Sequence, residues 1–375
     1  MKSKDRVLIL GPLPPPIHGV SMVNKMIVDS NLLADKFFLT VVPFNFSKSI
    51  EDIGFISWKK IIEYFNVLFK LILTLARLRF KVVYFSISPI GKAFIRDSIF
   101  VLVIRLFRVK YILHIHGLGI KECYQSSSLI VRYLYRTVFG TGHVIILSDT
   151  HKYDVDFLSP QSIRVVPNGV SFELRMIEKS LPDGSGNFTL LFFSNLVISK
   201  GVLLVVEAFE ILQMRYNAPL QLRIVGADGD ISAHMLRQMI ALKGLKNVAI
   251  DKPAFGVAKE KIFYQSDLFI YPTMLDYFPL VLLEAMHAGL PIISTDTGAI
   301  REILGINMQS EPSGLLLENK TAQALAESIW SLYNNPALAI RFSESGKKKA
   351  IELYSKHAFE QSIFDVLTQI ISSND

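Results

Sequence analysis

Two acidic residues lie eight positions apart around a predicted helix start. Asp276 precedes Pro279, and Glu284 follows it within the expected helix. Proline suits a first helical position because the N–H that it lacks would have no partner there. A helix start just after a strand presents free N–H groups and a positive dipole end, which bind anions. Glu284 lies among apolar residues and needs a hydrogen-bonding partner, which a ribose diol can supply. Alternatively, Asp276 caps a helix and Glu284 pairs with a core arginine.

A lysine occupies an electrostatically unfavourable position in the same half of the chain. Lys200 directly precedes a helix predicted over 201–214, so its ammonium faces the positive end of the helix dipole. A bound pyrophosphate would resolve this conflict. The alternative is that Lys200 is a solvated surface cation.

Histidine and glycine residues follow predicted strands in the first half of the chain. The loop over 11–19 (GPLPPPIHG) follows the first strand, and we expect it to pack close to a substrate. It lacks the G-x-G-x-x-G fingerprint of dinucleotide-binding folds. His116 ends the fourth predicted strand, and His114 points to the same face one step deeper. A strand-end histidine can equally be a satisfied core residue.

Short apolar runs alternate with helix-length amphipathic segments along the chain. This alternation predicts βα units and parallel sheets. A turn-rich segment over 171–187 predicts a linker between two Rossmann-like domains over 1–170 and 188–354. The predicted strands are 6–10, 38–42, 82–87, 111–116, 144–148, 164–166, 189–194, 221–225, 248–251, 268–271, 292–294 and 314–317.

Composition bounds the class of protein. A chain of 375 residues that is 50% hydrophobic and 19% charged can form two full cores, which excludes disordered and fibrous classes. Residues 1–167 hold 22 Lys and Arg against 11 Asp and Glu, whereas the remainder holds 18 against 22. The first half is therefore suited to anionic partners. The single cysteine, Cys123, excludes a disulfide or a cysteine-ligated zinc site within the chain and fits a reducing cytoplasm.

Two basic amphipathic segments predict a peripheral membrane contact. Over 58–80 and 94–110, apolar residues recur at helical spacing among nine Lys and Arg and two acids. Such helices can bury an apolar face at an anionic lipid boundary. The alternative is a pair of core helices with solvated cations, and nucleic acid is disfavoured because its binding motifs are missing. We expect no membrane span and no signal peptide, and a cytoplasmic protein at the inner face of the membrane.

Taken together, these motifs resemble glycosyltransferase family 4, the retaining nucleotide-sugar enzymes with the GT-B fold. The resemblance rests on the acids that flank Phe278-Pro279-Leu280 and on 166–170 (VPNGV), 199–201 (SKG), 224–226 (IVG) and 267–269 (DLF). It covers nearly all of 167–354, and the first half matches more weakly through 17–20 (IHGV) and 114–117 (HIHG). It implies an α/β fold of two Rossmann-like domains that face a central cleft. A C-terminal helix over 355–375 would pack back towards the N-terminal domain, which would bind the acceptor.

The resemblance also implies roles for individual residues. His116, Asp276 and Lys200 are the candidate catalytic residues, because the first two would contact the transferred sugar and the lysine the diphosphate. His18 and Gly19 are the candidates for acceptor binding, and His18 could act as a general base in an inverting enzyme. The candidate donor-binding residues are Gly19, Asn195, Lys200, Gly226, Phe278, Pro279, Leu280 and Glu284.

The sequence departs from the family pattern near the expected donor site. Asp276 replaces the usual glutamate and is shorter by about 1.5 Å. Asn195 replaces an arginine that usually accompanies the lysine, so another cation, such as Arg301, would have to compensate. No D-x-D motif for a metal-bound diphosphate lies in a suitable loop, and we expect Asp154 and Asp156 on a solvated helix face. We therefore expect neither a metal ion nor a cofactor.

The sequence thus predicts a metal-independent, retaining glycosyltransferase. It would move a sugar from a nucleoside diphosphate sugar to a hydroxyl of a glycan or lipid-linked glycan, in cell-surface polysaccharide or lipopolysaccharide biosynthesis. The alternatives are an inverting GT-B transferase, a nucleotide-sugar epimerase, and a non-catalytic module that binds a nucleotide sugar or a glycan.

Overall fold

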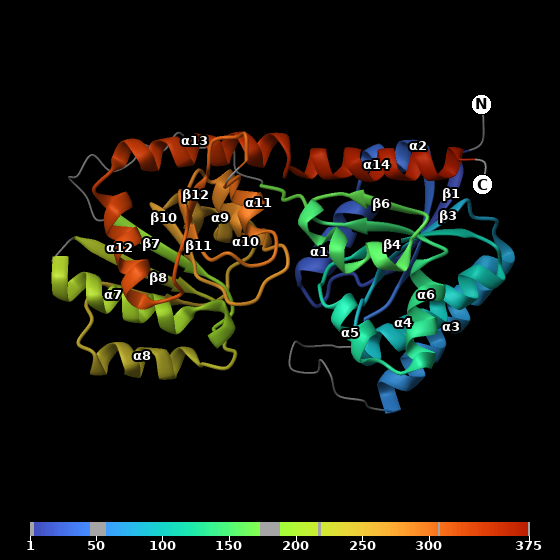
Figure 1. Ribbon diagram of the computed structural model, residues 1–375, viewed down its shortest axis with the longest axis horizontal. Coiled ribbons are helices and arrows are strands. Elements are labelled where there is room, and N and C mark those ends of the chain that lie inside the picture. The colour runs from blue at the N-terminus through green and yellow to red at the C-terminus, as the bar shows by residue number, and fades with distance from the viewer. Residues whose placement is uncertain (1–3, 46–57, 173–187, 217–218, 307, 374–375) are drawn as a thin grey trace. The chain divides into compact units, whose positions relative to one another are not determined.

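The computed structural model describes residues 4–45, 58–172, 188–216, 219–306 and 308–373 (Figure 1). The chain divides into two compact units. Unit 1 comprises residues 1–169 together with 356–375, and unit 2 comprises residues 170–355. Of the expected linker over 171–187, all but the first two residues lie outside the described residues.

Unit 1 is built on a six-stranded parallel sheet with the order β2-β1-β3-β4-β5-β6. Successive side chains of a strand point to opposite faces, and the buried residues follow this rule. Leu8 and Leu10 belong to one core, whereas Val7 and Ile9 belong to the other. The strands are β1 (Asp5–Gly11), β2 (Phe37–Pro43), β3 (Val82–Ile87), β4 (Lys110–Ile115), β5 (His143–Ile146) and β6 (Ser162–Val165).

Helices cover both faces of this sheet. The face of Leu8 is covered by α3 (Trp58–Arg77), α4 (Gly91–Leu106), α5 (Ile120–Ser126) and α6 (Leu129–Phe139). The opposite face is covered by α1 (Gly19–Val28), α2 (Asn31–Lys36) and α14 (Lys356–Ser372). Lys110 Nζ at the start of β4 donates a 2.6 Å hydrogen bond to the carbonyl oxygen of Ser373, which ties the end of α14 to this sheet. The short helices η1 (Asp149–Asp154) and η2 (Asp156–Leu158) follow β5.

Unit 2 contains a second six-stranded parallel sheet, with the order β12-β11-β10-β7-β8-β9. Its strands are β7 (Phe188–Phe193), β8 (Leu220–Val225), β9 (Val248–Asp251), β10 (Leu268–Tyr271), β11 (Ile292–Ser294) and β12 (Gly314–Leu316). The loops that follow β7, β8, β10 and β11 emerge at one edge of this sheet, which is where open α/β sheets bind ligands. The helices are η3 (Ile198–Lys200), α7 (Val202–Tyr216), α8 (Ala233–Leu242), α9 (Gly256–Tyr264), α10 (Leu280–His287), α11 (Ile300–Leu304), α12 (Ala322–Tyr333) and α13 (Pro336–Glu352).

All twelve predicted strands are present, with ends that differ by at most two residues. The predicted α/β class is therefore confirmed. Two helix starts differ slightly from the prediction. The helix expected over 201–214 begins at Val202, and Pro279 is the N-cap of α10 rather than its first residue.

The expectation that Asp154 lies on a solvated helix face is wrong. Asp154 is buried and accepts hydrogen bonds from the backbone N–H groups of Gly119, Ile120 and Lys121 at 2.9, 3.1 and 2.8 Å. These groups begin α5, and their N-cap residue, Gly119, has no side chain to cap them. Asp154 therefore supplies the cap from a distant loop, whereas Asp156 is exposed, as expected.

Candidate active site

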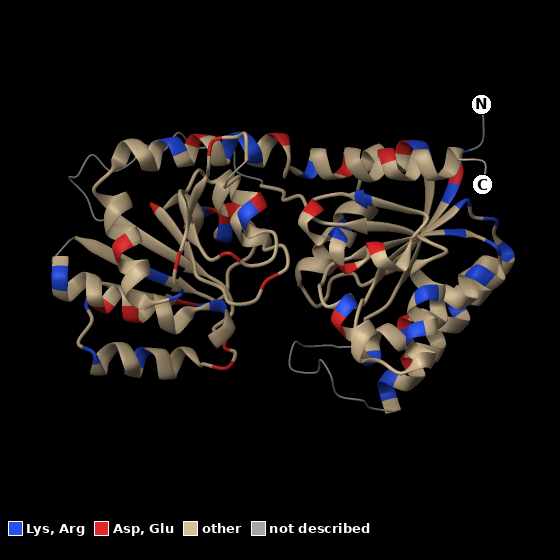
Figure 2. Cartoon of the chain, in the orientation of Figure 1, with Lys and Arg blue, Asp and Glu red and all other residues tan. Residues whose placement is uncertain are grey.

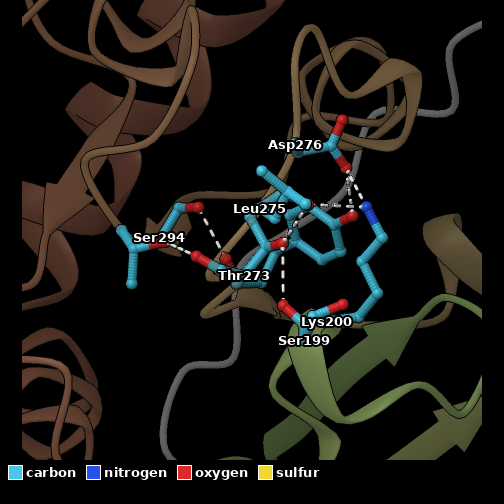
Figure 3. A network of polar contacts seen from close by, with 8 residues as sticks. Ser199, Lys200, Thr273, Leu275, Asp276 and Ser294 are labelled. Carbon is cyan, nitrogen blue, oxygen red and sulfur yellow. Dashed lines mark hydrogen bonds and ion pairs between the residues drawn. The ribbon is translucent and has the colours of Figure 1, made fainter. Parts of the chain in front are cut away.

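Two of the predicted catalytic residues of unit 2 form a direct ion pair (Figure 3). Lys200 ends η3, and Asp276 lies in the loop between β10 and α10. Lys200 Nζ lies 2.6 Å from Oδ2 of Asp276 and donates a second hydrogen bond of 3.0 Å to the carbonyl oxygen of Leu275. The side chains are 27% and 17% exposed, so the pair is partly shielded and still reachable from solvent.

A buried tyrosine completes this group and was not predicted as a site residue. The hydroxyl of Tyr271 donates a 2.6 Å hydrogen bond to Oδ2 of Asp276, the same oxygen that Lys200 contacts. Burial and the neighbouring carboxylate hold the pKa of Tyr271 well above its usual value, so the phenol keeps its proton. Both donors meet Oδ2, and Oδ1 has no partner among the described residues. Asp276 can therefore accept a ligand hydroxyl on Oδ1.

The loop that carries Asp276 is held on two sides. Thr273 donates to the carbonyl oxygen of Ser199 at 3.2 Å, which joins the loop to η3. Ser294, at the end of β11, donates to the carbonyl oxygen of Tyr271 at 2.6 Å, and Thr295 donates to that of Thr273. Figure 3 shows these contacts beside the ion pair. The loop is thus anchored to two neighbouring elements, which positions the carboxylate.

A glycine that the sequence analysis missed shapes the same loop. Gly298 has φ +55°, and a Cβ there would lie 2.2 Å from the carbonyl oxygen of Asp276 and 2.5 Å from that of Tyr277. The N–H of Ala299 donates a 3.0 Å hydrogen bond to the latter oxygen. Only glycine leaves room for this contact at that backbone conformation.

The start of α10 is the predicted anion site of unit 2. Pro279 is the N-cap, and no side chain caps this helix end. The alternative that Asp276 caps α10 is therefore wrong. Phe278 is buried, and its ring packs against that of Tyr354 at 6.2 Å between centroids. Its side chain fills the core, so that the turn 278–280 can offer backbone groups alone to a ligand.

Glu284 has an unpredicted cationic partner in α9. Lys259 Nζ donates a 2.6 Å hydrogen bond to Oε1 of Glu284 and lies 5.0 Å from the centroid of the Phe193 ring. The alternative of a core arginine is therefore wrong in residue type. Burial raises the pKa of Glu284, and the Lys259 ammonium acts against that rise. Lys259 Nζ also lies 2.6 Å from Oε2, so the ammonium pairs with both carboxylate oxygens, although among the described residues only Oε1 accepts a hydrogen bond.

The remaining donor candidates lie at the carboxyl ends of β7 and β8. Asn195 is exposed. A Cβ at Gly226 would lie 1.8 Å from the carbonyl oxygen of Ser194, so that glycine is required for the packing of two loops. Arg301, named above as a compensating cation, instead pairs with Asp296 at 2.5 Å. The cation that contacts Glu284 is Lys259, which no sequence motif indicated.

In unit 1, His18 is the N-cap of α1. Its Nδ1 accepts a 3.4 Å hydrogen bond from the N–H of Ser21, and the Ser21 hydroxyl accepts one of 3.0 Å from the N–H of His18. Gly19 is exposed at the first position of α1. Burial lowers the pKa of His18, which favours a neutral ring with its proton on Nε2. Neither nitrogen then offers a free lone pair, which argues against His18 as a general base.

The loop over 11–19 is clamped by two asparagines. Asn24 is buried and donates a 3.0 Å hydrogen bond to the carbonyl oxygen of Pro12. Asn45 donates to the carbonyl oxygens of Leu13 and Pro15 at 2.6 and 2.7 Å. The loop is therefore positioned by side chains from α1 and from the segment after β2, which agrees with a ligand-facing role.

His116 follows β4, and its ring is tilted by 38° against that of His114, with 4.0 Å between the ring centroids. His114 Nδ1 is hydrogen-bonded to the hydroxyl of Tyr84 at 2.5 Å. Burial, reinforced by the proximity of His18, lowers the pKa of His116 to about 3. Its Nε2 is buried and has no hydrogen-bond partner among the described residues. His116 is thus a neutral ring with one unused nitrogen.

Metal-ligating side chains do not gather in the part of the chain that the structure describes. Within these ranges no group of three His, Cys, Asp or Glu residues could hold a metal ion. Metal independence itself stays a prediction.

Residues 175–349 match the sequence family described as glycosyl transferases group 1. Nearly half of the chain is thus similar to the group 1 glycosyl transferases. The match contains Asn195, Lys200, Gly226, Asp276 and Glu284. The predicted resemblance is confirmed at this level, whereas family 4 and a retaining outcome stay predictions.

Curated relatives of the chain carry glycosyltransferase names. An uncharacterized glycosyltransferase of Methanocaldococcus jannaschii is 22% identical over 66% of each chain. A D-inositol 3-phosphate glycosyltransferase of Pseudarthrobacter chlorophenolicus is 29% identical over 46% of this chain and 43% of its own. The capsular polysaccharide biosynthesis glycosyltransferase CapM of Staphylococcus aureus is 21% identical over 68% and 69%. The chain thus spans less than two thirds of the length of the first two.

Solved structures of similar fold cover nearly the whole chain. Anabaena HepE in complex with UDP-glucose matches with a TM-score of 0.70 at 17% identity, over 97% of this chain and 99% of that one. Sucrose-phosphate synthase from Thermosynechococcus elongatus matches with a TM-score of 0.69 at 15% identity, over 98% and 100%. At such identities the likeness shows the fold, and it confirms the predicted GT-B class.

Proposed function

We propose that this relative of the group 1 glycosyl transferases transfers a sugar from a nucleoside diphosphate sugar to a hydroxyl of a glycan or lipid-linked glycan, with retention of anomeric configuration. The observation that carries this proposal is the Lys200–Asp276 pair, held by Tyr271 beside the uncapped start of α10. A cation and a helix start suit a diphosphate, and a carboxylate oxygen without a partner suits a sugar hydroxyl. Two of the relatives are named for capsular polysaccharide and teichuronic acid biosynthesis, which supports a role in cell-surface polysaccharide assembly.

The leaving diphosphate would be bound by Lys200 and by the N–H groups of the first turn of α10. Negative charge develops on this group as its bond to the sugar breaks, and fixed donors stabilise such charge without reorganising. Lys200 is already oriented by Asp276 and by the carbonyl oxygen of Leu275, so its ammonium is held in place before a donor binds. The arginine missing at Asn195 leaves Lys200 as the principal cation for the diphosphate.

The two carboxylates would bind opposite ends of the donor. Asp276 would accept hydrogen bonds from the transferred sugar on Oδ1. Glu284 would accept hydrogen bonds from the ribose hydroxyls, while the Lys259 ammonium beside both of its oxygens favours the ionised carboxylate despite its burial. Gly226 would leave space for the donor near β8.

The histidines of unit 1 suit binding rather than proton transfer. His116 is neutral at physiological pH because burial lowers its pKa to about 3, so that it would hydrogen-bond the transferred sugar. The Nδ1 lone pair of His18 is used by the helix cap, which leaves His18 and Gly19 to contact the acceptor.

This arrangement favours a mechanism without a protein base. The bond between the anomeric carbon and the β-phosphate oxygen breaks, and the acceptor oxygen forms a new bond to that carbon on the same face. The acceptor proton passes to the departing phosphate oxygen, so charge and atoms balance. We propose that no metal ion or cofactor takes part, since Lys200 and α10 supply the positive charge.

The test begins with a thermal-shift screen of the full chain against nucleoside diphosphates and their sugars. We expect one nucleotide series to raise the melting temperature, and Lys200→Ala to abolish that rise. The matched control is Lys246→Ala, an exposed lysine of the same unit whose ammonium forms no hydrogen bond or ion pair with the described residues. Addition of a chelating agent should change nothing. A wild-type protein that responds to none of the nucleotides would refute the proposal.

A second measurement addresses stereochemistry. The product formed with the best donor and a glycan acceptor is examined by NMR, and we expect the anomeric configuration of the donor. Inversion, combined with inactivity of His18→Ala, would support an inverting enzyme instead. Turnover that survives Glu284→Ala undiminished would place the ribose site elsewhere.

We further propose that the protein acts in the cytoplasm at the inner face of the membrane, where lipid-linked acceptors are available. The excess of Lys and Arg in residues 1–167 supports this location.

A further inference from the structure

The outer side of α3 carries a stripe of large apolar side chains. They are spaced by four, three and four residues and therefore share one face of the helix. The buried residues Val67, Leu71 and Leu75 lie on the opposite face, against the sheet. The stripe consists of Trp58, Ile62, Phe65 and Phe69, which are 82%, 61%, 59% and 62% exposed.

The neighbouring helix α4 repeats this spacing. Its exposed residues are Ile95, Ile99, Leu102 and Leu106, and its buried ones include Phe94, Phe100, Val101 and Ile104. An apolar stripe at helical spacing is ordinarily buried against protein or lipid. The inner side of α4 packs on the core of unit 1, whereas its outer apolar residues stay exposed among the described residues.

A third helix extends the apolar surface. Leu129, Ile130 and Tyr133 at the start of α6 are 81%, 81% and 73% exposed. α4 contacts both α3 and α6, and all three helices lie on the same face of the sheet (Figure 1). We call the exposed apolar residues of α3, α4 and α6 the three-helix face. Monomeric proteins rarely leave so many large apolar side chains together in water.

The charge around the three-helix face is strongly positive. The three helices hold nine Lys and Arg and only two acids, Glu63 and Asp97. Asp97 is buried and paired with Arg96 at 2.7 Å, so it contributes little outward charge. Lys59, Lys70 and Arg77 are exposed and share one edge of α3, beside its apolar stripe. Figure 2 shows cations recurring along these helices.

We infer that the three-helix face docks unit 1 on an anionic lipid bilayer. The apolar side chains would enter the boundary between headgroups and acyl chains, and the flanking cations would contact the phosphates. Trp58 and Tyr133 are of the types enriched at that boundary. None of the helices among the described residues is long and apolar enough to cross a bilayer, so contact would be peripheral.

The charge distribution favours lipid over a second copy of the chain. A symmetric dimer through this face would bring like charges together, which is unfavourable. An anionic bilayer instead complements both the apolar stripes and the cations. The inference deepens the proposed use of a lipid-linked acceptor, and its test does not depend on enzymatic activity.

The experiment is sedimentation of the full chain with vesicles of phosphatidylcholine, alone or mixed with phosphatidylglycerol. We expect binding to the mixed vesicles and at least tenfold weaker binding of the variant that combines Phe65→Glu with Phe69→Glu. The matched control combines Met235→Glu with Leu242→Glu, two exposed apolar residues of α8, and should bind as the wild type does. Charge reversal by Lys59→Glu, Lys70→Glu and Arg77→Glu should remove the preference for phosphatidylglycerol.

Two further measurements distinguish variants that fail to fold from variants that fold and fail to bind vesicles. Circular dichroism should show unchanged folding for every variant. Thermal shift with the best nucleotide should be unchanged as well, because that site lies in unit 2. Vesicle binding that is unchanged by both sets of α3 substitutions would overturn the inference. A wild-type chain that stays in the supernatant would overturn it as well. A dimer in sedimentation equilibrium that Phe65→Glu disrupts would assign the face to a second copy instead.

Discussion

Asp276 receives two hydrogen bonds on one oxygen and keeps the other for a ligand. The Tyr271 hydroxyl is the donor that a substrate cannot replace, because it is buried under the loop. Tyr271→Phe should therefore let Asp276 turn and should lower kcat about tenfold, or about 1.4 kcal/mol, as expected for one hydrogen bond to a charged group. Steady-state kinetics with the best donor measures this change. Tyr111→Phe, which removes a buried hydroxyl of unit 1, should lower stability without lowering kcat; equal kcat losses would contradict the assigned role.

The pKa of Glu284 provides a second prediction for single residues. Burial raises this pKa, so the carboxylate takes up its proton at a higher pH than an ordinary glutamate does. A protonated carboxyl accepts ribose hydrogen bonds poorly, and nucleotide affinity should therefore fall as the pH decreases through this raised pKa. Lys259→Met removes the charge that opposes the rise and should move the fall to still higher pH. Isothermal titration at several pH values measures the shift, and coincident profiles would show that Lys259 does not tune Glu284.

Several site residues were predictable from sequence because each belongs to a local pattern. Lys200 precedes a helix, and Asp276 and Glu284 flank a helix-starting proline. Tyr271 and Lys259 were not predictable in this way. The reach of Tyr271 to Asp276 depends on how the loop folds back over β10, and Lys259 meets Glu284 only because α9 packs against α10.

At the scale of elements, the loop between β10 and α10 depends on a neighbour without a side chain. Gly298→Ala would place a methyl group against the carbonyl oxygens of Asp276 and Tyr277. A positive φ alone costs a non-glycine residue about 1–2 kcal/mol, and forced overpacking adds about 1–3 kcal/mol. We therefore expect lower thermal stability together with a loss of kcat, because the loop must move.

Gly244→Ala is the matched control for this substitution. Gly244 has φ +64°, close to the +55° of Gly298, and a Cβ there would meet nothing within 4 Å. The control should show the backbone cost alone and keep full activity. Equal melting temperatures and equal kcat values for the two variants would show that contact of residue 298 with the loop affects neither stability nor catalysis.

The strands were predictable because parallel strands buried on both faces are short, continuous apolar runs. Central strands such as β3 and β10 follow this rule, whereas the edge strands β6 and β9 are only partly buried. The predicted ends of all twelve strands were accurate to two residues. The role of Asp154 was not predictable, because its local spacing with Asp156 resembles a polar helix face. Its three backbone partners begin at Gly119, more than thirty residues earlier in the chain. Long-range capping of this kind leaves no local signal.

At the scale of the whole molecule, the C-terminal segment belongs to the first unit. α14 contributes Phe359, Ile363 and Leu367 to the core that also contains Val7 and Ile9 of β1. Residues from both ends of the chain therefore build one sheet face, and unit 1 can be complete only after the whole chain has been made. The family resemblance predicted a helix over 355–375 that packs back towards the N-terminal domain, and α14 does pack on the sheet of unit 1.

The two halves of the chain differ in net charge, and we expect them to bind anions in different ways, the first half a lipid surface and the second a nucleotide. Residues 1–167 carry a cationic excess, whereas the remainder is slightly acidic and, under the proposed function, would bind its anion through the partly shielded Lys200. Exposed charges are screened as the Debye length falls from about 10 Å at 0.1 M salt to about 3 Å at 1 M. Across this range we expect vesicle binding to weaken at least tenfold and nucleotide affinity to weaken much less. Parallel sedimentation and titration test this, and an equal loss in both would show that one electrostatic field serves both ligands.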